Sequence, residues 1–137
     1  MVNCLFDAGL ERFHLRKPGI SLESYGDFLK GIDMVFYDRI VIHQFHEYGP
    51  DWGVTQFHYS EVKRSSRKAA GFSTSIHDLA DLNKINGFHY SFFGPVFKSL
   101  SKPGYSGTLD LDFKLPRHMQ NKLVALGGIT VENIAHV

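Results

Sequence analysis

The amino-acid sequence predicts an α/β protein built on a parallel sheet, and a (β/α)8 (TIM) barrel fits the pattern best. Six short apolar or β-branched segments alternate with helical or short connecting segments, as in parallel strands joined by crossovers. Polar residues and glycines follow these segments, where TIM barrels carry their active sites. No GxGxxG motif follows the first predicted strand, so a dinucleotide-binding sheet fits less well.

Each predicted strand is rich in β-branched or aromatic residues or alternates apolar with polar residues. In the first, Phe13 and Leu15 alternate with His14 and Arg16 before a turn at Pro18. Within residues 39–43 the sequence RIVIH is β-branched throughout its centre. The six predicted strands are residues 10–16, 39–43, 54–59, 69–75, 88–93 and 123–126.

Helices are predicted where apolar residues recur at helical spacing. Residues 1–9 form an amphipathic helix that ends at Gly9, and Ser21 opens a second helix through Ile32. Shorter helices are predicted at 78–85 and from Thr130 onward. Residues 44–52 are expected to be helical or irregular, and 109–115 are ambiguous.

Composition narrows the class of protein. The 137 residues, 43% of them hydrophobic, predict one globular domain, residues 1–137. A net charge of +1 without a long basic run argues against nucleic acid as a partner. The single Cys4 fits a reducing compartment, and neither a membrane span nor a signal peptide is predicted. We therefore expect a cytoplasmic protein.

Residues 92–107 form the stretch around which the chain is organised. A short aromatic run ends at Gly94, and hydroxyl groups, glycines and the cation of Lys102 follow. Hydroxyls, backbone N–H groups and a lysine together suit an anion such as phosphate. An ordinary surface loop has a similar composition and is the alternative interpretation.

Four strings carry a family resemblance: FHLRKPG at 13–19, STSIHDLADL at 73–82, FFGPVFKSLSKPGY at 92–105 and VALGGITVENI at 124–134. In order and spacing they resemble the thiamine phosphate synthase and TenI-like family of (β/α)8 barrels. The resemblance covers residues 12–134 and implies strands two to seven of such a barrel. Because an incomplete barrel exposes strand edges, we expect either an incomplete chain or a homo-oligomer or swapped assembly.

The resemblance also implies a function. The synthase couples hydroxymethylpyrimidine diphosphate to thiazole phosphate and releases pyrophosphate, so phosphorylated small molecules are the implied partners. It implies catalytic roles toward pyrophosphate for Arg16, Ser75 and Lys102. The implied substrate- and phosphate-binding positions are His14, His43, His77, Ser99, Ser101, Gly127 and Gly128.

Several of these residues also have simpler interpretations. Arg16 could form only a surface ion pair, and Gly127 with Gly128 could form only a tight turn. His77 is interpreted as a local cap or packing residue in preference to a catalyst. His14 stands where the family more often has glutamine, and it could simply fill the barrel interior.

Metal use is in doubt. Where the family's synthases carry Asn-Asp, whose Asp holds Mg²⁺, this sequence has His43 and Gln44, which are not hard anionic ligands. Glu61 is a second acidic candidate, but it is out of register by one or two residues. A transition metal held by histidines at the strand ends is a separate hypothesis, with His43, His46, His58 and His77 as its candidates.

Two other functions stay open. The TenI-like thiazole tautomerases use a histidine within the Gly-x-Val-Phe turn, and Pro95 occupies that position here. This replacement argues against tautomerase acid/base chemistry. Binding of thiazole phosphate or thiamine phosphate without catalysis is the remaining alternative.

Overall fold

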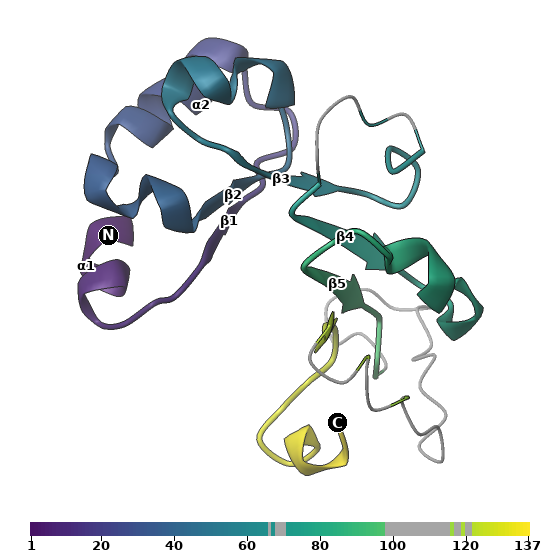
Figure 1. Ribbon diagram of the computed structural model, residues 1–137. Helices are drawn as coiled ribbons and strands as arrows, with labels where there is room; N and C mark the ends of the chain where they lie inside the picture. The colour runs from purple at the N-terminus through teal and green to yellow at the C-terminus, as the bar shows by residue number, and fades with distance from the viewer. Residues whose placement is uncertain (66, 68–70, 98–115, 117–118, 120–121) are drawn as a thin grey trace. The chain divides into compact units, whose positions relative to one another are not determined.

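The computed structural model divides the chain into two compact units, Met1–His58 and Tyr59–Val137 (Figure 1). It describes all residues except 66, 68–70, 98–115, 117–118 and 120–121. Each unit contains parallel strands and helical segments. Within the described part of the chain, no helix is long and apolar enough to cross a membrane.

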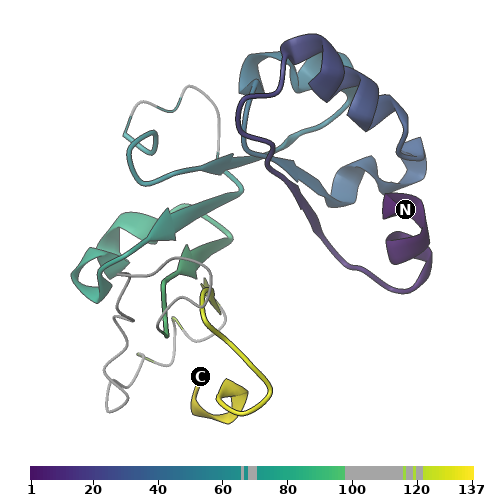
Figure 2. The ribbon, with the colours of Figure 1, turned by 180° about the vertical axis from the view of Figure 1, so that it is seen from behind.

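The first unit contains three parallel strands, of which the third continues to the first residue of the second unit. In both views of the ribbon, its helical segments lie to one side of its strands (Figures 1 and 2). Its elements are α1 (Val2–Asp7), β1 (Phe13–Leu15), α2 (Leu22–Lys30), the 3-10 helix η1 (Met34–Arg39), β2 (Ile40–Ile42), the 3-10 helices η2 (His46–Tyr48) and η3 (Pro50–Trp52), and β3 (Gln56–Tyr59).

Helix α2 forms where the sequence predicts it. Ser21 is the N-cap, and its side chain accepts a hydrogen bond from Ser24 N at 3.2 Å. The buried face of the helix includes Tyr25 and Leu29. The Tyr25 hydroxyl donates to the backbone oxygen of Leu15 at 2.8 Å, which ties the helix to the end of β1.

The strand register separates an apolar face from a polar face in the first unit. Leu15 lies opposite Ile42, and Ile42 lies opposite Phe57; all three side chains are buried. Side chains that face each other across neighbouring strands share a face, and successive residues alternate between faces. His14, which lies opposite Val41, therefore belongs to the other face.

The second unit contains three more parallel strands, in the order β4, β5, β6. Its buried core includes Ile76, Ile85, Phe93, Val96 and Met119. The elements are β4 (Ser73–Ile76), the 3-10 helix η4 (Leu79–Ile85), β5 (Tyr90–Phe93), β6 (Leu123–Ala125) and the 3-10 helix η6 (Ile134–His136).

The α/β class with parallel strands is confirmed, and all six predicted strands are present, although each is shorter than predicted. The helices predicted at 78–85 and after Thr130 are 3-10 segments, as is common for short connections. Segment η1 was not predicted. The ambiguous range 109–115 lies outside the described residues. A closed eight-stranded barrel and a single domain over 1–137 stay predictions.

The turn after β5 packs directly on the chain after β6. The N–H of Val96 donates to Leu126 O at 3.0 Å, and the N–H of Phe97 donates to Gly127 O at 3.1 Å. A Cβ atom added at Gly94 would lie 2.1 Å from Leu126 O. Only glycine therefore permits this approach of the two backbones.

We predict that Gly94→Ala lowers the free energy of unfolding by about 2 kcal/mol, because the added carbon forces the two backbones apart. Urea denaturation measures the change. The control is Gly31→Ala, where an added Cβ would lie 3.4 Å from Phe28 O at an ordinary negative φ. We expect it to change stability by less than about 1 kcal/mol. Equal effects of the two substitutions would contradict this account.

Candidate functional site

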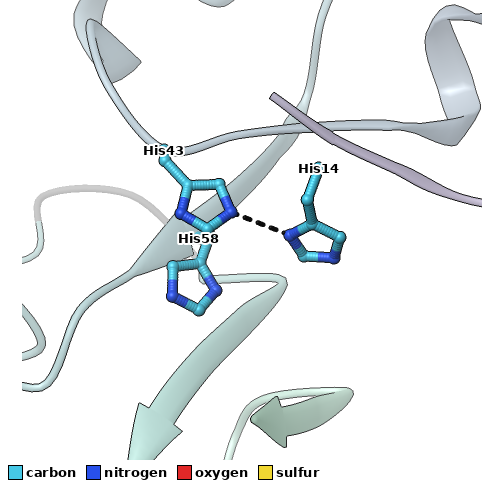
Figure 3. A group of neighbouring side chains, drawn as sticks. All are labelled: His14, His43 and His58. Atoms are coloured by element: carbon cyan, nitrogen blue, oxygen red, sulfur yellow. Dashed lines mark hydrogen bonds between the residues drawn. The ribbon is translucent and has the colours of Figure 1, made fainter. Parts of the chain in front are cut away.

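Three histidines come together in the first unit (Figure 3). His14 Nδ1 and His43 Nε2 lie 2.9 Å apart and share a hydrogen bond. The rings of His43 and His58 stack with their centroids 4.0 Å apart. One ring nitrogen from each residue lies within 4.8 Å of the other two. We call these three side chains the histidine cluster.

The cluster follows from strand register. His14 lies opposite Val41 on β2, and Val41 lies opposite Gln56 on β3. His43 is two residues beyond Val41, and His58 is two residues beyond Gln56, so period-two alternation brings all three side chains to one face. His14 thus lies on β1, His58 on β3, and His43 directly after β2.

Two further polar side chains extend this face toward the start of the strands. Arg12, two residues before His14, donates through Nη1 to Gln56 Oε1. The Gln56 amide donates in turn to Asp38 O. Arg16, two residues after His14, is exposed beyond the end of β1. The face that carries the histidine cluster therefore combines three imidazoles with an arginine at each end of β1.

Burial keeps the cluster neutral. It lowers the pKa of His14 to about 4, and the nearby Arg12 charge adds to the shift. Burial likewise lowers the pKa of His43 to about 2, with contributions from His58 and His14. Burial also lowers the pKa of His58 to about 3, with contributions from His14, His46 and Arg16. All three rings are therefore uncharged imidazoles at neutral pH.

The residues considered for Mg²⁺ do not suit it. Gln44 Oε1 accepts from Lys17 N at 2.9 Å, and its amide nitrogen donates to Lys17 O at 3.1 Å. Both polar atoms of the Gln44 side chain are therefore hydrogen-bonded to the backbone. In the second unit, Glu61 pairs with His77 at 2.7 Å and with Arg64 at 4.0 Å. Mg²⁺ prefers carboxylate and water oxygens. Gln44 has no carboxylate, and the carboxylate of Glu61 is paired with His77 and Arg64.

Two glycines form a turn just after β6 in the second unit. Gly127 and Gly128 have φ angles of 99° and 68°, values that glycine adopts readily and other residues rarely do. Asn133 holds the turn from both sides. Its amide donates to Gly128 O at 2.8 Å, and its Oδ1 accepts from Thr130 N at 2.7 Å.

The same turn packs on the motif after β5, as the hydrogen bonds from Val96 and Phe97 show. GPVF in the third resemblance string and ALGGI in the fourth are therefore neighbours in space. Among the described residues, the N–H groups of Gly127 and Gly128 have no hydrogen-bond acceptor. Such groups at a strand end can donate to a phosphate.

Ser75 lies on β4 opposite Phe92 and is half-buried. Its register places it on the face away from Ile76 and Phe93, which belong to the core. Its backbone oxygen accepts from Arg64 Nη1 at 3.0 Å. His77 is exposed and paired with Glu61, an arrangement consistent with the simpler interpretation of a local contact.

The predicted site residues fall into three sets. The first unit holds Arg16, His14 and His43. Those of the second unit are Ser75, His77, Gly127 and Gly128. Ser99, Ser101 and Lys102 lie outside the described residues. Their roles toward substrates all stay predictions.

The histidine cluster matches the group predicted from the sequence only in part. Of the four candidates for a transition-metal site, His43 and His58 belong to the cluster, whereas His46 contacts Ile42 O at 3.1 Å and His77 pairs with Glu61. His14 takes their place. His14 and His58 alternate with the buried Leu15 and Phe57 of their own strands, but only the register between strands brings them to His43.

A hollow of about 640 Å³ opens beside β4, lined by Glu61, Arg64, Ser65, Arg67, Lys84 and Asn86. The cationic side chains that line it already have partners. Lys84 pairs with Asp81 at 2.6 Å, Arg64 donates to Ser75 O, and Arg67 lies over the Phe88 ring. The hollow is therefore a weaker candidate than the strand-end turn or the histidine cluster.

Parallel strands, helical segments and glycine turns at strand ends define an α/β protein. Its structure is similar to that of thiamine phosphate pyrophosphorylase from Bacteroides thetaiotaomicron, with a TM-score of 0.73 and 26% sequence identity. The match covers 96% of this chain and 66% of that enzyme, so the chain spans slightly less than two thirds of the enzyme's length. No family model and no curated protein matches the sequence. The structural match confirms the resemblance carried by the four sequence strings.

We predict that acid destabilises the metal-free protein through the histidine cluster. An unfolded histidine takes up a proton near pH 6.5, whereas the folded cluster stays neutral to about pH 4 or below. The unfolded state then binds more protons, so stability falls as the pH decreases from about 6.5 to 4, by up to about 1.4 kcal/mol per pH unit for each histidine.

Urea denaturation at several pH values measures this slope. His58→Gln removes one titrating group and should make the slope shallower over the same range. His136→Ala, a substitution near the chain end and outside the cluster, should leave it unchanged. Identical slopes for the wild type and His58→Gln would contradict the prediction.

Proposed function

We propose that this chain binds phosphorylated intermediates of thiamine biosynthesis and acts as a thiamine phosphate synthase-like transferase. The observation that carries the proposal is the direct packing of the Gly94–Phe97 turn on the Gly127–Gly128 turn. These are the strings that resemble the family, and the structural neighbour is a thiamine phosphate pyrophosphorylase. Gly127 and Gly128 would offer N–H groups to the thiazole phosphate.

The proposed reaction transfers the pyrimidinylmethyl group, through its methylene carbon, from diphosphate to the thiazole nitrogen. The carbon–oxygen bond to the diphosphate breaks, the carbon–nitrogen bond forms, and pyrophosphate leaves with the bonding electrons. Cationic and hydroxyl groups that stabilise the departing charge lower the barrier. We assign this role to Arg16, Lys102 and Ser75. Arg16 suits it because guanidinium binds phosphate oxygens in pairs.

Binding without turnover is the second candidate function. It is favoured by His43 and Gln44, which replace the Asn-Asp pair whose Asp the resemblance implies for Mg²⁺. Gln44 is instead hydrogen-bonded to the backbone of Lys17. A TenI-like tautomerase is less consistent, because Pro95 cannot transfer a proton.

Calorimetric titration with thiamine phosphate and with pyrophosphate, each with and without Mg²⁺, tests ligand binding. We predict binding of both ligands, with pyrophosphate affinity reduced about 10- to 100-fold by Arg16→Ala or Lys102→Ala through loss of a charged hydrogen bond. Lys30→Ala is the matched control, because Lys30 pairs with Asp27 on the exposed side of α2. No binding of either ligand by folded protein would contradict the proposal.

Pyrophosphate release then separates the two candidates. If the chain is a transferase, mixing it with hydroxymethylpyrimidine diphosphate and thiazole phosphate yields pyrophosphate and thiamine phosphate in equal amounts. Binding without product supports the non-catalytic candidate.

A further inference from the structure

We propose that His14, His43 and His58 form a binding site for a divalent transition metal such as Zn²⁺ or Co²⁺. His14 lies on β1, His58 on β3 and His43 directly after β2, and one nitrogen of each lies within 4.8 Å of the others. Three histidines with an open fourth position are a known arrangement of protein zinc ligands. The inference stands on this cluster alone and does not depend on the proposed function.

The distances leave only a small adjustment for metal binding. Tetrahedral zinc with Zn–N bonds of about 2.0–2.1 Å places its nitrogens about 3.3 Å apart. The His14 and His43 nitrogens, at 2.9 Å, need to separate slightly, and the third nitrogen needs to approach. The stacked rings of His43 and His58 would have to turn, and the terminal torsion of histidine has a broad energy minimum.

The hydrogen bond between His14 and His43 identifies two ring nitrogens that could bind the metal. At 2.9 Å one of the two nitrogens carries a proton and the other accepts it. If both rings carry their protons on the opposite nitrogens, two lone pairs face the space between them. A cation then replaces the shared proton, without ionisation of either ring.

The donor set selects the class of metal. Imidazole nitrogen suits Zn²⁺, Co²⁺, Ni²⁺ and Cu²⁺, whereas Mg²⁺ and Ca²⁺ prefer oxygen. Arg12 and Arg16 lie on the same side of β1 and repel a dication. Their charges favour an anionic oxygen as the fourth ligand. The alternative is a hydrogen-bonded histidine cluster that binds no metal.

Titration of the full chain with Co²⁺ tests the site. The protein is prepared without a histidine tag. A chelator first removes bound metal, and the chelator is then removed before the titration. We expect one equivalent of Co²⁺ to give a visible absorption band that Zn²⁺ abolishes and excess Mg²⁺ does not. His43→Ala should weaken binding by more than the roughly 10- to 100-fold loss typical of an outer-shell partner. His136→Ala, which removes a histidine elsewhere, should bind as the wild type does.

Circular dichroism checks that His43→Ala is folded. A second measurement needs no variant: NMR of the histidine ring nitrogens should show that zinc shifts the signals of His14, His43 and His58 and leaves His136 in place. Absence of stoichiometric Co²⁺ binding by folded wild-type protein would overturn the proposal. Equal binding by wild type and folded His43→Ala, or zinc-induced shifts at other histidines only, would overturn it too.

Discussion

Parallel pairing of short strands, with side chains that alternate between two faces, is the constraint on which the rest of the structure depends. In the first unit, Leu15, Ile42 and Phe57 share one face because they lie opposite one another in register. The same register leaves His14, His43 and His58 on the other face. A slip by one residue would exchange the two faces, so the apolar packing also determines where the imidazoles meet.

In the second unit, two backbones approach closely where β5 and β6 end. Gly94 allows Leu126 O to come near, and the positive φ angles of Gly127 and Gly128 turn the chain after β6. Asn133 then fixes that turn through its own amide. The glycines therefore have a structural role whether or not a phosphate binds, and the proposed phosphate site uses a turn that the fold already requires.

Much of this was predictable from the sequence. Local patterns predicted all six strands and the helix capped by Ser21, because alternation and capping depend on neighbouring residues. The strand ends were less predictable, since pairing with another strand decides them. Segment 34–39 was missed for lack of a helical apolar stripe. The histidine cluster was missed as a group because register between strands, which joins His14 to His43, cannot be read within any one strand.

The central claim is that the turn after β6 binds a phosphate group, and glycine amide signals test it most directly. Protein labelled with ¹⁵N-glycine shows the amides of its 13 glycines while thiazole phosphate is added. The account predicts saturable shifts at Gly127 and Gly128, whereas Gly9 and Gly19 in the first unit stay unchanged. Saturable binding that leaves Gly127 and Gly128 unmoved, or no binding at all by folded protein, would contradict it.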